Sequence, residues 1–268
     1  VVVAMTVEEA NAAVEDMLSG NRFGDAGSTV VIEEFMDGEE ASLLAFVDGK
    51  TVVPMIASQD HKRIFDGDKG PNTGGMGTYA PAPVLTDALR DEAMKTILEP
   101  MVAAMQKEGM PYVGCLYAGL MITSQGPKVV EFNARFGDPE TQVVLPLLDS
   151  DLGQIMMACA TGTLTADMVK WKDSSAACVI LASKGYPETS SKGDVIHGDI
   201  KQHDTTIVFH SGTKLVGEEY VTNGGRVLGV VGLGKDLRTA LDRAYGRIEH
   251  IDFEGMQYRT DIGAKAFK

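Results

Sequence analysis

The sequence predicts a mixed α/β or α+β fold in about two domains. Its 268 residues exceed one typical domain, and a hydrophobic content of 44% is enough to give each domain a core. Segments with helical spacing alternate with short β-branched segments along the chain. After residue 172 the sequence changes to short strands, glycine-rich turns and one helix, which predicts a domain boundary near residue 170.

In the first third of the chain we expect a helix, several strands and a long loop. Thr6 and Glu9 have the spacing of a capping box, and the apolar residues around them predict a helix over residues 7–18. Residues 58–83 are rich in glycine, proline and charge without a helical or strand period, which is typical of a functional loop. β-Branched and aliphatic runs predict strands at residues 29–32, 41–47 and 51–53.

The rest of the chain predicts three helices separated by strands. Residues 86–109 have helical spacing, and Pro100 should kink this helix. A second helix is expected after Asp151 and should end at Gly162, and a third is expected over residues 237–248. The strands expected in this part are residues 114–123, 128–132, 176–182, 206–210 and 226–233.

Charge and composition exclude several classes of protein. The chain has 24 Lys and Arg against 38 Asp and Glu, a net charge of −14, and so acidic a chain should repel a nucleic-acid backbone. Neither a membrane-spanning run nor a signal peptide is recognisable in the sequence. The three cysteines form no C-x-x-C motif and suit reduced core thiols. We expect a cytoplasmic protein with small-molecule partners, no membrane or nucleic-acid partner, and an oligomeric state that the sequence leaves open.

The first candidate site is an acidic segment at the end of the strand expected at residues 29–32. Backbone groups at such a strand end can bind an adenine edge, and a nearby glutamate can bind a ribose diol. A solvated acidic turn is the alternative interpretation. The candidate nucleotide-binding residues are Glu33, Glu34, Phe35, Met36 and Glu40.

The second candidate site joins a cluster of cations to a glycine-rich loop. His61, Lys62 and Arg63 precede this loop, whose bare backbone N–H groups can approach an anion. Phosphate or carboxylate recognition requires this combination, although glycines in a loop often form ordinary turns. The loop residues considered for substrate binding are Asn72, Thr73, Gly74, Gly75, Met76 and Gly77.

The third candidate site is a metal site at the end of the strand 128–132. Glu131 and Asn133 are two residues apart, so their side chains should leave the same face, while Val130 and Phe132 face the other way. Two hard oxygen donors on one face suit Mg²⁺, and Mn²⁺ is the alternative metal. A chance polar strand end would look the same. The turn that follows adds Arg135, which can bind phosphate or carboxylate, and the acidic residues Asp138 and Glu140.

Other chemically suggestive residues have simpler explanations. His197, His203, His210 and His250 have no metal-binding spacing, so we expect surface or core roles for them. The glycines of residues 229–234 lack the order of a dinucleotide fingerprint. A strand with a close backbone approach, followed by a helix, explains these glycines better.

Taken in order, the three candidate sites resemble the nucleotide-binding core of the ATP-grasp ligases. Residues 135–142 read Arg-Phe-Gly-Asp-Pro-Glu-Thr-Gln and resemble the signature of the glycinamide ribonucleotide synthetase family, also called phosphoribosylamine-glycine ligases. The resemblance covers essentially the whole chain. Further motifs similar to that family lie at residues 59–63, 70–77, 193–198 and 222–227.

The resemblance implies a partial ATP-grasp domain followed by a small C-terminal α/β domain. Residues 1–36 would be the back half of the ATP-grasp lid, residues 37–169 the body with the metal and substrate loops, and residues 170–268 the C-terminal domain. Family members begin with a further N-terminal domain and with the front of the lid, including a phosphate-gripping lysine. Val1 would lie just after that region. We therefore expect these 268 residues to turn over poorly or not at all by themselves.

The resemblance also assigns roles to the candidate residues. Glu33 and the backbone of residues 34–36 would hold the adenine of ATP, and Glu40 the ribose. Glu131 and Asn133 would ligate Mg²⁺. Lys62, Arg63 and Arg135 would neutralise phosphate or carboxylate oxygens as the catalytic residues. The loop of residues 72–77, together with Asp138, would bind glycine and 5-phosphoribosylamine.

The activity implied is an ATP-dependent ligation in purine biosynthesis. Glycine would take the γ-phosphoryl group of ATP to form glycyl phosphate, and the amine of 5-phosphoribosylamine would then displace phosphate. The products would be glycinamide ribonucleotide, ADP and phosphate. Two alternatives remain: another ATP-grasp carboxylate-amine ligase, and a non-catalytic nucleotide-binding module.

Overall fold

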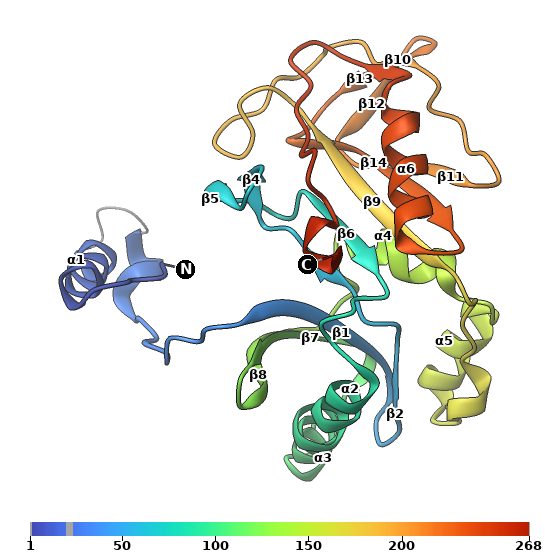
Figure 1. Ribbon diagram of the computed structural model, residues 1–268. Helices are drawn as coiled ribbons and strands as arrows, with labels where there is room; N and C mark the ends of the chain where they lie inside the picture. The colour runs from blue at the N-terminus through green and yellow to red at the C-terminus, as the bar shows by residue number, and fades with distance from the viewer. Residues whose placement is uncertain (1, 20–23, 268) are drawn as a thin grey trace. The chain divides into compact units, whose positions relative to one another are not determined.

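The structure, a computed structural model, describes residues 2–19 and 24–267 and divides the chain into two compact units. The first unit is Val1–Asp37 and contains helix α1 (Val7–Leu18) and the short 3-10 helix η1 (Gly24–Ser28). The second unit is Gly38–Lys268 and contains every strand of the described residues (Figure 1).

Helix α1 begins with the predicted capping box. The Thr6 hydroxyl accepts the Glu9 N–H at 3.1 Å, while the Glu9 carboxylate accepts the Met5 N–H at 2.8 Å. The strand expected at residues 29–32 is wrong, because these residues form no strand and Val31 and Ile32 are 78% and 81% exposed. The described residues of this unit contain no strand with which residues 29–32 could pair their backbone hydrogen bonds.

The second unit begins with a four-stranded antiparallel sheet in the order β2-β1-β7-β8. Its strands confirm the predicted hairpins. Helices pack on both faces of this sheet, and the sheet's side chains accordingly contribute to two separate apolar clusters. The strands are β1 (Glu39–Asp48), β2 (Val52–Pro54), β7 (Val113–Thr123) and β8 (Gly126–Asn133).

The helix expected at residues 86–109 is present but changes its hydrogen-bond pattern in the middle. It consists of α2 (Asp87–Ala93), the π-helical turn η2 (Met94–Leu98) and α3 (Glu99–Lys107). Pro100 lies in the first turn of α3. Because proline has no N–H to donate along the helix, the π turn immediately before it accommodates the break that the sequence predicted as a kink.

The expectation of an unstructured loop at residues 58–83 is wrong. Four short strands lie there, and two of them form one edge of a five-stranded antiparallel sheet in the order β11-β14-β9-β6-β3. Strands of two to four residues are too short to show a hydrophobic period. These strands are β3 (Gln59–Asp60), β4 (Arg63–Phe65), β5 (Lys69–Asn72) and β6 (Gly77–Ala80).

The same five-stranded sheet continues beyond residue 170. The predicted strands and last helix are confirmed as β9 (Ser175–Ala182), β11 (Thr206–His210), β14 (Arg226–Gly234) and α6 (Leu237–Ile248). The domain limits proposed at residues 36 and 169 stay a prediction. Elements that the sequence did not reveal are β10 (His197–Gly198), β12 (Thr213–Val216), β13 (Glu219–Thr222) and β15 (Ile251–Asp252).

Two short helices pack against the two large sheets, α5 (Leu152–Thr161) against β1 and β7, and α4 (Thr141–Val144) against β6 and β9. Helix α5 begins at Asp151, whose carboxylate accepts the Gln154 N–H at 3.0 Å, and ends at left-handed Gly162 as predicted. No helix in the described part of the chain is long and apolar enough to cross a bilayer. The remaining helices are η3 (Leu145–Leu147), η4 (Ala166–Met168) and η5 (Ala264–Phe267).

Two predictions about small residues are confirmed. Cys115, Cys159 and Cys178 are buried, unpaired thiols in the core. A Cβ on Gly232 would lie 2.0 Å from the Ala240 carbonyl oxygen of α6. The glycines of β14 therefore permit a close approach of strand and helix backbones rather than nucleotide binding.

Candidate functional site

A small surface cavity in the second unit brings together residues from all three predicted sites. Glu40 from β1, Lys62 from the loop after β3 and Glu131 from β8 all line it. Its volume is about 20 Å³, whereas an enclosed small-molecule site needs roughly 300 Å³ or more. The cavity by itself is therefore too small to enclose a small-molecule ligand. The other lining residues are Ala41, Ser42, Asp60, Tyr117, Gly119, Leu120 and Val130.

The two predicted metal ligands lie side by side on β8. The Asn133 amide donates to Glu131 Oε1 at 3.0 Å, which confirms that both side chains leave the same face, while Phe132 between them packs into the core. Among the described residues no group of three His, Cys, Asp or Glu side chains could hold a metal ion. The carboxylate and amide oxygens nevertheless fit Mg²⁺, which takes only one or two protein oxygens and fills its other positions with water and phosphate.

A β-bulge corrects the prediction for Val130. Gly119 on β7 lies opposite Glu131, but the next residue, Leu120, lies opposite Val129. Val130 is therefore the extra residue, and it lines the cavity beside Glu131 instead of facing the core. The bulge turns this end of β8 so that both residues face the cavity.

Lys62 is held by a buried carboxylate. Its Nζ lies 3.0 Å from Asp60 Oδ2, and the Asp60 side chain is only 5% exposed. Burial and the neighbouring Glu140 carboxylate raise the pKa of Asp60 to about 7. Burial opposes the charge of Lys62, but the Asp60 carboxylate outweighs it, so the pKa of Lys62 is raised. The pair therefore orients a cationic side chain at the edge of the cavity.

A polar cluster lies behind the cavity. Glu140 is 3% exposed, and its Oε1 accepts hydrogen bonds from the Tyr117 hydroxyl at 2.8 Å and from Ser42 Oγ at 3.0 Å. Burial and the Glu140 charge raise the pKa of Tyr117, which keeps this phenol a donor. The motif at residues 135–142 pointed to Glu140. No motif pointed to Ser42 or Tyr117, which are single polar positions in apolar strands.

The glycine-rich loop packs directly against this cluster. Gly75 has φ +116°, and a Cβ there would lie 2.5 Å from Pro139 Cδ and 2.8 Å from Asp60 Oδ1. Only glycine allows this approach. Thr73 fixes the loop from the other side, because its hydroxyl donates to the Lys62 carbonyl at 2.8 Å and accepts the Gly75 N–H at 2.9 Å.

Two residues of the C-terminal part anchor the loop. Arg226 Nη1 donates to the carbonyl oxygens of Gly74 at 2.8 Å and Asp138 at 2.9 Å, and Nη2 donates to Asp138 Oδ2 at 3.1 Å. The Tyr186 hydroxyl accepts the Gly74 N–H at 2.9 Å. Arg226 thus joins the loop to the Asp138 turn. The motif at residues 222–227 was the only sequence signal for it.

The other predicted loop residues differ in exposure. Asn72 and Arg63 are exposed at the paired ends of β5 and β4, and Arg63 donates to the Gly70 carbonyl at 2.7 Å. Met76 is fully buried, and Gly77 is buried in β6. Arg135 is exposed and donates to the Phe136 carbonyl at 2.8 Å.

The remaining candidates lie in less informative surroundings. Glu33, Glu34 and Phe35 are exposed and Met36 is half-buried, in a stretch of the first unit without helix or strand. His61 is 1% exposed, and burial together with Arg259 and Lys265 lowers its pKa to about 4. This histidine is therefore a neutral core residue rather than a phosphate ligand.

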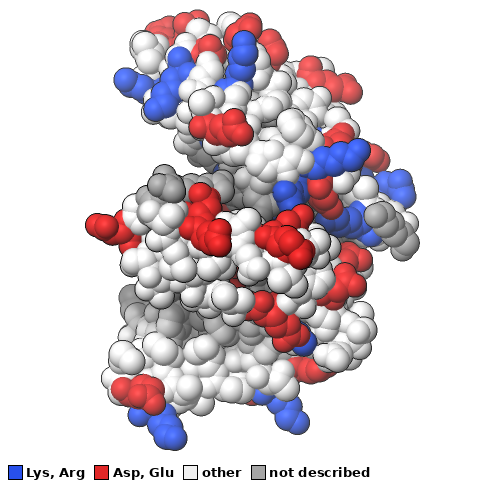
Figure 2. All heavy atoms as spheres, turned by 90° about the vertical axis from the view of Figure 1, so that its left-hand side faces the viewer, with Lys and Arg blue, Asp and Glu red and all other residues white. Residues whose placement is uncertain are grey.

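The surface charge agrees with the acidic composition. Acidic and basic side chains are interspersed over the face shown in Figure 2, and the net charge of the chain is −14. Attraction of an anion to this molecule must therefore arise from individual, locally placed cations.

Comparison with protein families gives two matches that together span most of the chain. Residues 1–141 match the model described as phosphoribosylglycinamide synthetase, ATP-grasp (A) domain. Residues 176–265 match the model of the C domain of the same synthetase. The two matches lie on either side of the predicted boundary near residue 170.

Curated relatives of similar sequence are named phosphoribosylamine-glycine ligase. The protein of Caulobacter vibrioides is 55% identical over 100% of this chain, and that of Neisseria meningitidis serogroup A is 52% identical over 99%. The chain spans about 63% of the length of either relative.

Solved structures give the same picture. The phosphoribosylamine-glycine ligase of Thermotoga maritima matches with a TM-score of 0.82 and 33% identity, covering 95% of this chain and 64% of that one. The biotin carboxylase domain of a Hydrogenobacter thermophilus carboxylase, solved with MgADP and bicarbonate, has a TM-score of 0.69 at 14% identity, covering 94% of this chain and 54% of that one. The second likeness shows the ATP-grasp fold alone.

Proposed function

The chain belongs to the phosphoribosylglycinamide synthetase family, and on that premise we propose that its complete form joins glycine to 5-phosphoribosylamine at the expense of ATP. A single observation supports this most strongly. Lys62, Glu40 and Glu131, which come from separate sequence motifs, line one cavity. An ATP-grasp ligase needs a cation, a ribose-binding carboxylate and a metal-binding carboxylate around one nucleotide.

The proposed reaction has two steps, and neither uses a covalent bond to the protein. A glycine carboxylate oxygen attacks the γ-phosphorus of ATP, so that ADP leaves and glycyl phosphate forms. The amine nitrogen of 5-phosphoribosylamine then attacks the acyl carbon, phosphate leaves, and the nitrogen loses a proton. Positioning and charge neutralisation therefore account for the catalysis.

Lys62, Arg63 and Arg135 are the proposed catalytic cations. Lys62 is pre-oriented by its ion pair with Asp60, so little side-chain entropy is lost when an anion binds. Arg63 and Arg135 are exposed and donate to backbone carbonyls, which leaves further guanidinium N–H groups to bind a phosphate or carboxylate.

Glu131 and Asn133 would hold Mg²⁺, or Mn²⁺ in its place. When bound, such an ion neutralises charge on the β- and γ-phosphate oxygens of ATP. The chain's own contribution is the bulged end of β8, which directs Glu131 toward the cavity that Lys62 also lines. The Asn133 amide, now bonded to Glu131 at 3.0 Å, has its oxygen free for the ion.

The nucleotide and the two other substrates have separate proposed sites. Glu33 and the backbone of residues 34–36 would bind adenine, and Glu40 the ribose. Of the loop residues, Asn72, Thr73 and Gly74, with Asp138, would touch glycine and 5-phosphoribosylamine. Gly75, Met76 and Gly77 are buried, so their part is to shape the loop. The protein would act on small molecules, in the cytoplasm.

A hybrid protein tests the proposal. In the Caulobacter vibrioides relative, the region that matches this chain would be replaced by the 268 residues. ADP release would then be measured with glycine and 5-phosphoribosylamine. We expect release that requires both substrates, and a loss of at least about tenfold in the Glu131→Gln hybrid. The chain alone should release little ADP.

Two results would overturn the proposal. One is a folded hybrid without ADP release beside an active Caulobacter vibrioides enzyme. The other is ADP release that bicarbonate or formate supports in place of glycine, which would indicate a different ATP-grasp ligase.

A further inference from the structure

Arg259 has the largest fully buried side chain among the described residues, and two of its contacts reach the β4–β5 hairpin. Nη1 donates to Asp68 Oδ1 at 2.9 Å and to the Arg63 carbonyl at 3.1 Å, and Nε and Nη2 donate to Asp261 at 2.7 Å each. Lys265 pairs with the other oxygen of Asp68 at 2.7 Å. A buried guanidinium is costly without such partners, so these bonds fix the hairpin and the C-terminal segment together.

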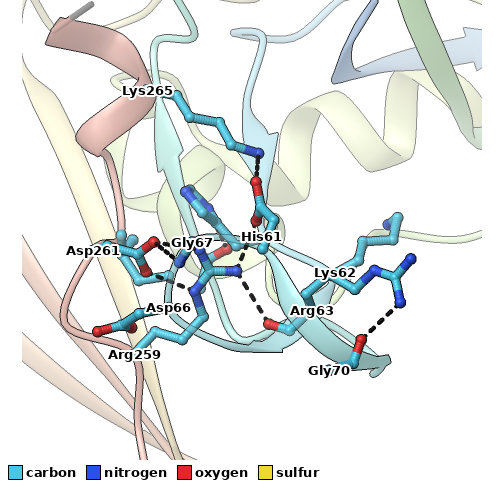
Figure 3. A network of polar contacts seen from close by, with 12 residues as sticks. His61, Lys62, Arg63, Asp66, Gly67, Gly70, Arg259, Asp261 and Lys265 are labelled. Atoms are coloured by element: carbon cyan, nitrogen blue, oxygen red, sulfur yellow. Dashed lines mark hydrogen bonds and ion pairs between the residues drawn. The ribbon is translucent and has the colours of Figure 1, made fainter. Parts of the chain in front are cut away.

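The residues next to this arginine hold the turn of the hairpin at further points (Figure 3). Thr260 donates its N–H to Asp66 Oδ1 at 2.9 Å, and its hydroxyl also bonds to Asp66. Asp261 Oδ2 accepts the Gly67 N–H at 2.8 Å. We call this set of residues the C-terminal clasp: Arg259, Thr260, Asp261 and Lys265.

Apart from the C-terminal clasp, the hairpin is held by few contacts. Ile64 packs against Met76, Ala182 and Tyr186, and Thr73 bonds to the Lys62 carbonyl at the base of the hairpin. Strands β4 and β5 pair only at Arg63 with Asn72 and at Phe65 with Lys69, with a register shift between them. Ile64 is the only buried residue of the two strands. A two-stranded ribbon of this size is marginal by itself in water. The position of the hairpin therefore depends on the C-terminal clasp.

We propose that Arg259 is a positioning residue for the substrate site, acting through the β4–β5 hairpin. The hairpin begins at Arg63 and ends at Asn72, so a displaced hairpin would misplace both residues, whereas Lys62 is held separately by Asp60. Arg259 lies 196 positions from Arg63 in sequence. This inference rests on the proposed function, which gives the hairpin residues a substrate to bind. It assigns the phosphate of 5-phosphoribosylamine to Arg63.

A matched pair of variants tests the inference. Arg259→Lys keeps the positive charge but cannot make the same set of bonds. Arg247→Lys is the control, because Arg247 is also nearly buried, with 9% of its side chain exposed, and bonds Asp199 at 2.6 Å and the Lys201 carbonyl at 2.8 Å. None of these control contacts involves the hairpin. Arg259 makes four side-chain hydrogen bonds and Arg247 two, so the free energy of unfolding of both variants is measured by urea unfolding and the exchange rates are compared after allowing for it.

Two measurements distinguish positioning from stability. The first is hydrogen exchange in the 268-residue chain at the Gly67 and Thr73 amides, which donate to Asp261 at 2.8 Å and to the Lys62 carbonyl at 2.7 Å. The second is the KM for 5-phosphoribosylamine in the hybrid enzyme. In Arg259→Lys we expect both amides to exchange about tenfold faster. The KM for 5-phosphoribosylamine should rise about tenfold, while the KM for ATP should change less than about twofold. Arg247→Lys should change neither.

Several outcomes would overturn the inference. Equal exchange at the two amides in Arg259→Lys and Arg247→Lys would show that the C-terminal clasp does not hold the hairpin. In a second outcome, Arg259→Lys exchanges faster but keeps its KM for 5-phosphoribosylamine, while Arg63→Gln raises that KM. This would show that the position of the hairpin does not matter for substrate binding. An unchanged KM in Arg63→Gln itself would instead refute the proposed role of Arg63. If Arg259→Lys fails to fold, Asp68→Asn weakens the same contacts and is measured in its place.

Discussion

Replacing Asp60 by asparagine should change the pH dependence of stability in a predictable direction. Burial and Glu140 raise the pKa of Asp60 from 3.8 to about 7 in the folded chain. Between these values the folded state keeps a proton that the unfolded state has released, so the free energy of unfolding falls as the pH rises. Asp60→Asn has nearly the same shape but no such proton.

The magnitude follows from the two pKa values. With a pKa of about 7 folded and 3.8 unfolded, Asp60 contributes about 3 kcal/mol to stability near pH 5 and almost nothing near pH 8. His61 acts in the opposite sense, because its pKa falls from 6.5 to about 4 on folding and its contribution improves as the pH rises. Between pH 5 and pH 8 the contributions of Asp60 and His61 to the stability of the wild-type chain therefore oppose each other.

The contribution of His61 to the pH dependence is the same in the variant and the wild type, so it cancels when the two are compared. Urea unfolding of both proteins near pH 5 and near pH 8 should show Asp60→Asn gaining about 3 kcal/mol relative to wild type between the two pH values. Asp204→Asn is the matched control, because Asp204 is exposed. A difference between Asp60→Asn and wild type that stays constant within about 0.5 kcal/mol would refute the reasoning.

The remaining predictions concern packing and the loop anchor. Gly232→Ala places a Cβ 2.0 Å from a carbonyl oxygen of α6 and should lower the free energy of unfolding by at least about 2 kcal/mol. Gly246→Ala, on the exposed side of the same helix with nothing within 4 Å of its Cβ, should raise it by about 0.5 to 1 kcal/mol; equal signs in urea unfolding would contradict this. Arg226→Met removes the bonds to Gly74 and Asp138 and should raise the KM for glycine in the hybrid enzyme about tenfold. An unchanged KM would show that the anchor does not position the loop.

The elements that could be predicted from the sequence are those long enough to repeat the hydrophobic period of a helix or a strand more than once. Helix α6 and strand β11 have the predicted bounds, because twelve residues of helix and five of strand repeat their pattern visibly. β3 has two residues, both polar and both buried, and so carried no pattern at all. The strand expected at residues 29–32 shows the opposite failure, since a β-prone run forms a strand only when another strand pairs with it.

The candidate site divides in the same way. Glu131 and Asn133 could be assigned to one face because their relation is local, two residues along one strand. The anchors of the loop depend on contacts between residues far apart in sequence: Arg226 lies 152 positions from Gly74. Nothing in the spacing of either residue reveals such a contact. The bulge at Val130 was also invisible, because it depends on the register with β7.

The ion pairs of the site indicate which cations remain available to an anion. Lys62 and Arg226 each lie within ion-pair distance of a carboxylate, which orients their side chains. Among the described residues, Arg63 and Arg135 have only backbone carbonyls as hydrogen-bond partners and no ion pair. In a chain of net charge −14, a guanidinium group without a carboxylate partner keeps its full attraction for an anion. Charge neutralisation in the proposed reaction should therefore depend on Arg63 and Arg135 as well as on Lys62.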